Sequence, residues 1–231
     1  MAEDSQKRLV IAIDGPAGAG KSTIAARLAR KLGYINLESG AMYRALALKA
    51  IESGTGFSDQ SGLLALTSQT KIELIPTSEG NRVLLDGRDV SSRIRDRDVT
   101  EAASVVSTHP RIRAWMVERQ REMGTRGGVI MEGRDIGTVV FPNAEVKIFL
   151  DADQGVRAER RLVQANAVGD PERAAKLVQD LRDRDRRDST RATSPLVAAE
   201  DAVHVDSTHL GIEQVIAEIE RVVAERLAER V

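Results

Sequence analysis

The sequence lacks several residue types and patterns, and each absence excludes a class of protein. Its 231 residues include no cysteine, which excludes disulfide bonds and thiolate metal sites. Aromatic residues make up 3% of the chain, too few for the stacking surfaces of single-stranded nucleic-acid binding. The net charge of −1 gives no global attraction to nucleic acid or to an anionic membrane. No apolar stretch approaches the roughly 18 residues of a membrane span.

Residues 1–8 are polar and contain no apolar core of a secretion signal. What remains is the composition of a globular protein, with 42% hydrophobic and 30% charged residues. A chain of this length forms one large domain or a core with a modest insertion. No exposed apolar stripe stands out. We therefore expect a cytoplasmic monomer that binds neither nucleic acid nor membranes.

Residues 15–22, of sequence GPAGAGKS, have the spacing of a phosphate-binding loop. An apolar β-branched run at 9–13 predicts a buried parallel strand before the loop, and an Ala- and Leu-rich segment predicts a helix from Ser22 to Leu32. The alternative is an ordinary Gly-rich turn, but the flanking strand and helix favour a phosphate site, since backbone N–H groups and the helix dipole then face the anion.

This loop predicts binding of a nucleoside triphosphate. We expect Lys21 to reach the β- and γ-phosphates and the Ser22 hydroxyl to bind Mg²⁺. The expected ATP-binding residues are Gly15, Pro16, Ala17, Gly18, Ala19, Gly20, Lys21, Ser22 and Thr23.

The rest of the chain alternates strands with helices, which is typical of an α/β fold with a parallel sheet covered on both faces. Apolar runs predict further strands at 34–37, 128–131, 146–150 and 202–205. Helices are expected at 39–53, 99–107, 110–123, 153–167 and 171–188, and a closing helix carries apolar residues from Ile212 to Val223. The expected fold is therefore a P-loop three-layer fold with a parallel central sheet.

Residues 57–98 interrupt this alternation. Short strands at 72–75 and 82–85, separated by turn residues at 76–81, indicate a small antiparallel insertion. We expect residues 57–98 to form an inserted monophosphate-binding subdomain with antiparallel and helical parts. Residues 1–56 and 99–231 would then form the kinase core.

The segment 182–191 is rich in arginine, with five Arg against three Asp and no Lys. A charge run of this kind can be a solvated helix surface. All of its cations, however, are arginines, which favours bidentate recognition of phosphate. On a helix, Arg184, Asp188 and Arg191 would also share one face. We therefore expect a mobile Arg-rich lid at about 182–195 that closes over the transferring phosphates and excludes water.

Two further motifs lie where predicted strands end, the edge at which α/β sheets bind ligands. Residues 38–44 (ESGAMYR) contain Tyr43 and Arg44, and residues 132–138 (EGRDIGT) contain Arg134 and Asp135. The alternatives are packing for the tyrosine and surface positions for the charged groups. The three histidines, His109, His204 and His209, carry no recognisable chemistry and are expected to be structural or exposed.

The sequence also contains no signature of a general base, such as a kinase His-Arg-Asp loop. An alcohol acceptor would need one, but a phosphomonoester with a second pKa of about 6 is already an anion at neutral pH. Arg side chains and Mg²⁺ are then sufficient, because positioning and charge stabilisation dominate phosphoryl transfer. The residues favour transfer from one phosphate to another.

From Leu9 to its C-terminal helix the chain resembles the bacterial-type cytidylate kinases, of the nucleoside monophosphate kinase group. The resemblance rests on residues 13–22 (IDGPAGAGKS), 39–44 (SGAMYR), 133–142 (GRDIGTVVFP), Arg184, Asp185, Asp188, Arg191 and 194–196 (SPL). It implies transfer of the γ-phosphoryl group of ATP to CMP or dCMP, in pyrimidine nucleotide metabolism.

The resemblance also implies roles for individual residues. Lys21, Arg134, Arg184 and Arg191 would be catalytic. Ser39, Tyr43, Arg44 and Arg134 would hold the acceptor nucleotide, chiefly its phosphate, and Ser104, Arg111 and Asp135 would read the cytosine edge. Arg184 and Asp188 would contact sugar and phosphate, and Arg191 a transferring phosphate. Glu38 and Glu132 stand where many relatives have Asp, which keeps the charge on a longer side chain.

Two other functions fit the P-loop. A P-loop kinase could act on another nucleotide or on a hydroxy acid. A switch or motor could hydrolyse ATP or GTP to change partners, but it would need a water-positioning group and an exposed effector surface. The Arg-rich segment is suited instead to excluding water.

Overall fold

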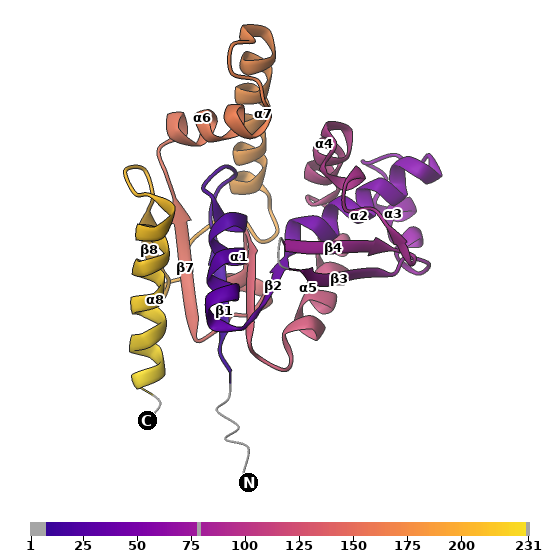
Figure 1. Cartoon of the computed structure of the whole chain (residues 1–231). Coiled ribbons are helices and arrows are strands. Elements are labelled where there is room, and N and C mark those ends of the chain that lie inside the picture. The colour runs from indigo at the N-terminus through magenta and orange to yellow at the C-terminus, as the bar shows by residue number, and fades with distance from the viewer. Residues whose placement is uncertain (1–7, 78–79, 230–231) are drawn as a thin grey trace.

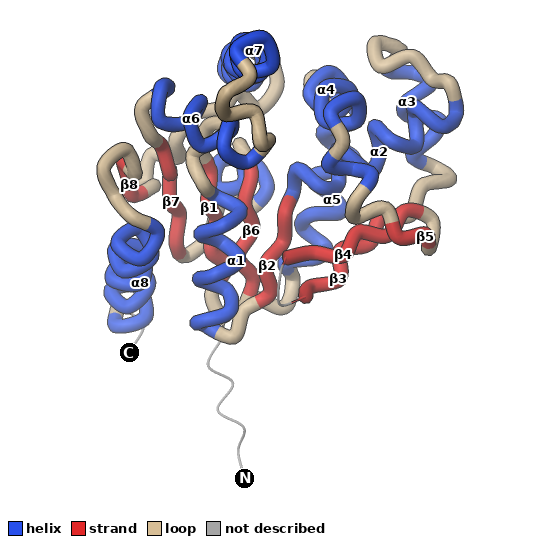
Figure 2. Tube along the Cα trace, turned by 45° about the horizontal axis from the view of Figure 1, so that its top comes forward, coloured by secondary structure: helices blue, strands red, loops and turns tan. Residues whose placement is uncertain are grey.

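The computed structural model describes residues 8–77 and 80–229, and its centre is a five-stranded sheet in the order β2-β6-β1-β7-β8. All neighbouring strands pair in parallel, and Figure 2 shows them side by side. The strands are β1 (Val10–Asp14), β2 (Ile35–Glu38), β6 (Val129–Gly133), β7 (Val146–Asp151) and β8 (Val203–Asp206). Parallel strands are buried on both faces, which explains their apolar sequences.

Helices cover both faces of this sheet. One face packs on α1 (Lys21–Leu32) and α8 (Ile212–Ala228) through residues such as Ile11 and Ile13. The other face packs on α5 (Pro110–Gly124) and on a short π-helix, η2 (Ile136–Val140), through residues such as Ala12. This alternation follows the two-residue period of β1. The predicted three-layer α/β fold with a parallel sheet is confirmed.

A second, antiparallel sheet lies beside the first (Figure 1). It contains β3 (Ile72–Thr77), β4 (Gly80–Leu85) and β5 (Arg88–Asp89). Its buried side chains, such as Val83 and Leu85, share a core with α2 (Ser39–Ser53), α4 (Arg97–Val106) and α5. The region 57–98 therefore buries its apolar residues against helices that precede and follow it in sequence.

One helix of this region was not located by the sequence analysis, and one predicted turn is shorter than expected. The segment before β3 forms a helix, α3 (Gln60–Thr67), that the sequence analysis did not include; the Asp59 carboxylate caps it by accepting from the Gly62 N–H at 3.0 Å. The turn expected at 76–81 is shorter, because Pro76 pairs with Asn81 and Thr77 with Gly80 in the β3–β4 ladder. A 3₁₀ turn, η1 (Arg93–Arg95), then leads to α4.

Helices α6 (Gln154–Gln164) and α7 (Pro171–Thr190) stand above the carboxyl edge of the sheet (Figure 1). Helix α7 ends at Thr190 because Arg191 has an extended backbone, with ψ near 139°. Arg184 and Asp188 therefore share this helix, whereas Arg191 follows its end. The predicted helical face is correct for two of its three residues.

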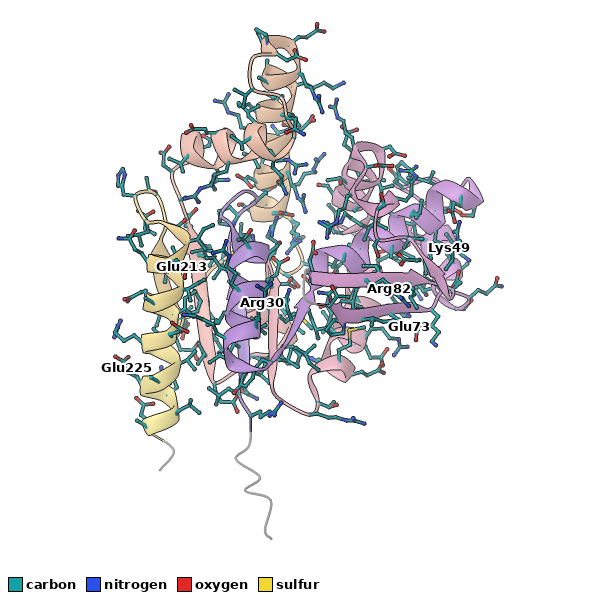
Figure 3. The ribbon with its side chains drawn as sticks, viewed as in Figure 1. Arg30, Lys49, Glu73, Arg82, Glu213 and Glu225 are labelled. Atoms are coloured by element: carbon teal, nitrogen blue, oxygen red, sulfur yellow. The ribbon has the colours of Figure 1, made fainter. Side chains whose placement is uncertain are left out.

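Charged side chains cover the outside of the molecule. Figure 3 shows Glu213 and Glu225 on α8 and Glu73 and Arg82 on the small sheet, all directed away from the two cores. His109 is half-buried, with its Nε2 2.7 Å from the Phe57 carbonyl oxygen, a structural contact of the kind predicted for the histidines. Within residues 8–77 and 80–229, no helix has the length and apolar character that crossing a membrane requires.

Candidate active site

The P-loop joins β1 to α1 at the carboxyl edge of the parallel sheet. Gly15 has a φ of +146°, and a Cβ there would lie 1.9 Å from the Leu150 carbonyl oxygen, so only glycine fits. Gly20 is left-handed at the N-cap of α1, which directs the first N–H groups of the helix into the loop. The buried Lys21 Nζ donates to the Pro16 carbonyl oxygen at 2.7 Å. The structure thus has the geometry of a phosphate cradle.

Five basic side chains from five segments converge beside this cradle. They are Lys21 of α1, Arg44 of α2, Arg134 after β6, Arg161 of α6 and Arg184 of α7. Burial, with Arg134 and Arg184 nearby, lowers the pKa of Lys21 to about 7. Burial and the neighbouring Arg134 lower the pKa of Arg184 to about 10. Cations that lie this close together, without an equal amount of negative charge beside them, form a site for several anionic groups.

Arg184 is the cation in this cluster whose positive charge is least neutralised by its neighbours. No hydrogen bond or ion pair to its guanidinium occurs in the described part of the chain, although the side chain is half-buried. The neighbouring charges with the largest effect on its pKa are Arg134, which lowers it, and Asp188, which raises it. A bound phosphate would supply the acceptors that this guanidinium lacks.

Two carboxylates at the same edge hold the arginines in place. Arg44 pairs with Glu38, and the attraction outweighs burial and keeps the pKa of Glu38 below its usual value. Arg134 Nε donates to Asp188 at 2.8 Å, and the Arg191 guanidinium lies 3.6 Å from the other oxygen of Asp188. Burial favours protonation of Asp188, but the surrounding arginines outweigh it and lower its pKa. The guanidinium groups are therefore fixed before any ligand arrives.

Glu132, at the end of β6, differs from these carboxylates. It accepts a hydrogen bond from the Ser22 Oγ at 3.0 Å. Burial raises the pKa of Glu132, and Lys21 opposes this shift. Ser39 Oγ donates to the Glu132 backbone carbonyl at 2.7 Å, which joins α2 to β6. Glu132 thus lies between the P-loop hydroxyl and the start of α2.

A second group of polar side chains is buried between α2, α5 and the turn after β6. Arg113 of α5 pairs with Asp135, and both are almost fully buried. The Arg113 guanidinium lies 5.6 Å from the centre of the Tyr43 ring, and Arg191 lies 3.8 Å from the other Asp135 oxygen. Burial raises the pKa of Tyr43 to about 12, so its hydroxyl remains a donor. This group offers both donors and acceptors to a planar polar ligand.

Most of the predicted residues are brought together here, but Arg111 is not. Arg111 is exposed in the first turn of α5, and positions two apart on a helix point in nearly opposite directions. Arg113, and not the predicted Arg111, is the arginine that lies beside Asp135. Ser104, on α4, is buried, and its hydroxyl has no hydrogen-bond partner among the described residues. Thr23 is exposed on α1.

Sequence reasoning also missed a contact that joins α6, α7 and the P-loop. Arg157 of α6 donates to the Ala17 carbonyl oxygen at 3.0 Å and pairs with Asp185 of α7. The Ala17 N–H in turn donates to Asp185 at 3.3 Å. A second ion pair links α7 to α4, with 2.7 Å between Arg97 and Asp180. Helix α7 therefore contacts both the P-loop and the neighbouring α4.

Comparisons with known proteins show which family this chain resembles over most of its length. The family model for cytidylate kinase matches residues 11–225. A cytidylate kinase of Geobacillus kaustophilus (strain HTA426) is 49% identical over 222 residues, covering 96% of this chain and 99% of the relative. One of Solibacter usitatus (strain Ellin6076) is 48% identical over 229 residues, covering 98% and 97%. One of Pelotomaculum thermopropionicum is 50% identical over 207 residues, covering 89% and 92%.

Proposed function

Because the chain belongs to the cytidylate kinase family, we propose that it transfers the γ-phosphoryl group of ATP to CMP or dCMP. The products are ADP and CDP or dCDP. The observation that carries the proposal, besides the family itself, is the pair of adjoining polar groups at one sheet edge. One surrounds a P-loop and the other buries Arg113 and Asp135, so the site offers polar partners to both a donor and an acceptor nucleotide.

The acceptor's base would be read by the buried group around Asp135. Cytosine carries an N4 amino donor, which the Asp135 carboxylate or the Ser104 hydroxyl can accept, and ring acceptors that suit the Arg113 guanidinium. The unpartnered Ser104 hydroxyl supports this assignment. The acceptor phosphate would be held by Arg44, Arg134 and Ser39, and Asp188 would contact the sugar.

The chemistry needs little beyond this arrangement. The acceptor phosphate is an anion at neutral pH and attacks the γ-phosphorus without a general base. Lys21, Arg134, Arg184 and Arg191 neutralise the charge that spreads over the transferring group, and the P-loop backbone holds the donor phosphates. Arg184 and Arg191 belong to the lid at about 182–195, which excludes water and so prevents hydrolysis of ATP.

Magnesium would be held by Ser22 together with Glu132, which the Ser22 hydroxyl already contacts. The residues fit this ion, because Mg²⁺ prefers oxygen ligands and usually takes few from the protein beside phosphates and water. Bound Mg²⁺ neutralises charge on the donor phosphates.

Chelation of divalent cations is therefore expected to abolish turnover. The measurement is the coupled kinase assay with excess EDTA, followed by excess Mg²⁺. Activity should fall to background and return when Mg²⁺ is restored. Full activity in EDTA would contradict the assignment.

A panel of monophosphates tests the function itself. We expect turnover with CMP and dCMP to exceed that with AMP, GMP and UMP by about tenfold or more in kcat/KM. Uracil lacks the amino donor that Asp135 accepts, and the purine bases are larger than cytosine. A preference for AMP or UMP would refute the base assignment. ATP hydrolysis independent of added monophosphate would favour a switch or motor instead.

The remaining proposals concern organisation. Residues 57–98 would be the monophosphate-binding subdomain, supported by the packing of their sheet on α2, which carries Tyr43 and Arg44. The protein would act as a cytoplasmic monomer, with nucleotides as its partners rather than nucleic acid or membranes.

A further inference from the structure

Asp14 is a buried carboxylate for which the proposed chemistry has no use. It is the last residue of β1, it directly precedes Gly15 of the P-loop, and it is only 5% exposed. Its Oδ1 accepts the N–H of Ile136 at 2.8 Å, and its Oδ2 accepts the N–H of Gly137 at 2.7 Å. Both oxygens are thus engaged by the backbone of the turn after β6.

That turn carries Arg134 and Asp135. The chain leaves β6 at Gly133, and Asp135 has an unusual backbone conformation, with φ −148° and ψ 27°. The π-helix η2 begins immediately afterwards, and the first N–H groups of any helix have no partner within it. Asp14 supplies acceptors to two of these groups and so fixes the direction in which the turn departs.

The fit around Asp14 is tight. A Cβ at position 137 would lie 3.4 Å from Asp14 Oδ2 and 3.2 Å from Lys147 Cδ, so glycine gives the carboxylate its close approach to the backbone. Asp14 pairs with Gly133 in the parallel ladder, which places it between the P-loop and the strand that leads to Arg134. One rigid side chain therefore connects the donor half of the site to the acceptor half.

We propose that Asp14 is a positioning residue that holds Arg134 and Asp135 in register with the P-loop. The reading of these two residues as acceptor-binding groups rests on the proposed function. A carboxylate is required because two N–H donors converge on it and an amide has one acceptor oxygen. With Asn at this position, the amide nitrogen would face one of the N–H groups, and the turn would shift to relieve this contact.

The negative charge of Asp14 does not stabilise the folded chain. Burial raises its pKa to about 6, although the two backbone hydrogen bonds lower it; Asp135 raises it further and Lys21 opposes this. Lys147 of β7 faces the same turn across Gly137. Because the pKa is higher in the folded than in the unfolded chain, the folded state binds more protons between about pH 4 and 6. The stability from this group is therefore fully present below about pH 4 and is lost as pH rises from there through about 6.

The test is Asp14→Asn, with Asp201→Asn as its control. Asp201 lies on the other side of Lys147, where it accepts from Nζ at 2.9 Å, and it has no part in the site. We expect Asp14→Asn to raise KM for CMP by about tenfold or more and to leave KM for ATP within about twofold. The control should leave both constants within about twofold. Equal increases in both KM values, or no increase, would overturn the proposal.

Two further readings distinguish positioning from a merely structural role. The melting-temperature difference between Asp14→Asn and the wild type should move in favour of the variant as pH rises from 5 to 7.5, because only the wild type has this carboxyl to ionise. A deficit of the variant that is the same at both pH values would show that the carboxylate is structural. Amide hydrogen exchange without any substrate should be faster at 136–140 in the variant and unchanged in the P-loop. Unchanged exchange at 136–140 would refute the contact's role even if the wild type failed to phosphorylate CMP.

Discussion

Substituting Lys21 by Met is expected to lower kcat with ATP and CMP by about 10²–10³-fold, the usual loss when one preorganised donor to the transition state is removed. Met keeps the length and the apolar stem of the buried side chain and removes only the charge. The pKa of Lys21 is about 7 in the free protein, because burial and the neighbouring Arg134 and Arg184 disfavour its charge. The negative charge of bound phosphates restores the protonated form, so the cation is strongest when the substrate is in place.

The matched control for this experiment is Lys31→Met on the same helix. Lys31 is exposed at the far end of α1 and pairs with Glu220 at 2.9 Å, so kcat should remain within about twofold. Both variants are measured in the coupled assay, and circular dichroism checks that the overall helix content is retained. A Lys21 variant with wild-type turnover and intact fold would mean that the loop does not hold the transferring phosphates.

The parts of the fold that the sequence predicted best are those specified locally. The apolar run of β1, the glycines of the P-loop and the Ala-rich α1 each have a pattern that requires no knowledge of distant residues. The expectation that ligands bind where the strands of an α/β sheet end also placed residues 38–44 and 132–138 correctly at one edge. It holds because the carboxyl ends of parallel strands lie on the same side of the sheet. Helix α3 was missed because it is short, follows two glycines and is capped by the Asp59 side chain.

The parts that could not be predicted depend on which face of a helix turns inward. Arg111 and Arg113 are both arginines in the first turn of α5, and nothing in their residue type separates them. The neighbouring Ile112 and Met116 are also buried, so the apolar spacing of α5 was the one available signal for the inward face. The pairing of Asp185 with Arg157 and the P-loop likewise depends on how α6 and α7 cross, which no local pattern encodes.

Arg113 and Arg111 therefore give a paired test of how the acceptor base is read. Truncating Arg113 to Ala leaves Asp135 buried with only the more distant Arg191 as a cation, and breaking such a pair costs about 3–5 kcal/mol. We expect kcat/KM for CMP to fall by about 10²–10³-fold and the melting temperature to fall by about 10 °C. Arg111→Ala, two residues away, removes an exposed side chain and should leave KM for CMP, KM for ATP and the melting temperature close to wild type.

Arg113→Lys separates recognition from stability. Lysine keeps the positive charge beside Asp135 and so preserves much of the stability, but it lacks the planar fork that can bind Asp135 and a ring acceptor together. We expect this variant to raise KM for CMP by about tenfold or more, with KM for ATP unchanged and a melting temperature only a few degrees below wild type. If Arg113→Lys binds CMP as the wild type does, the guanidinium supports the fold alone. If instead Arg111→Ala is the variant that raises KM for CMP, α5 presents its other face to the substrate.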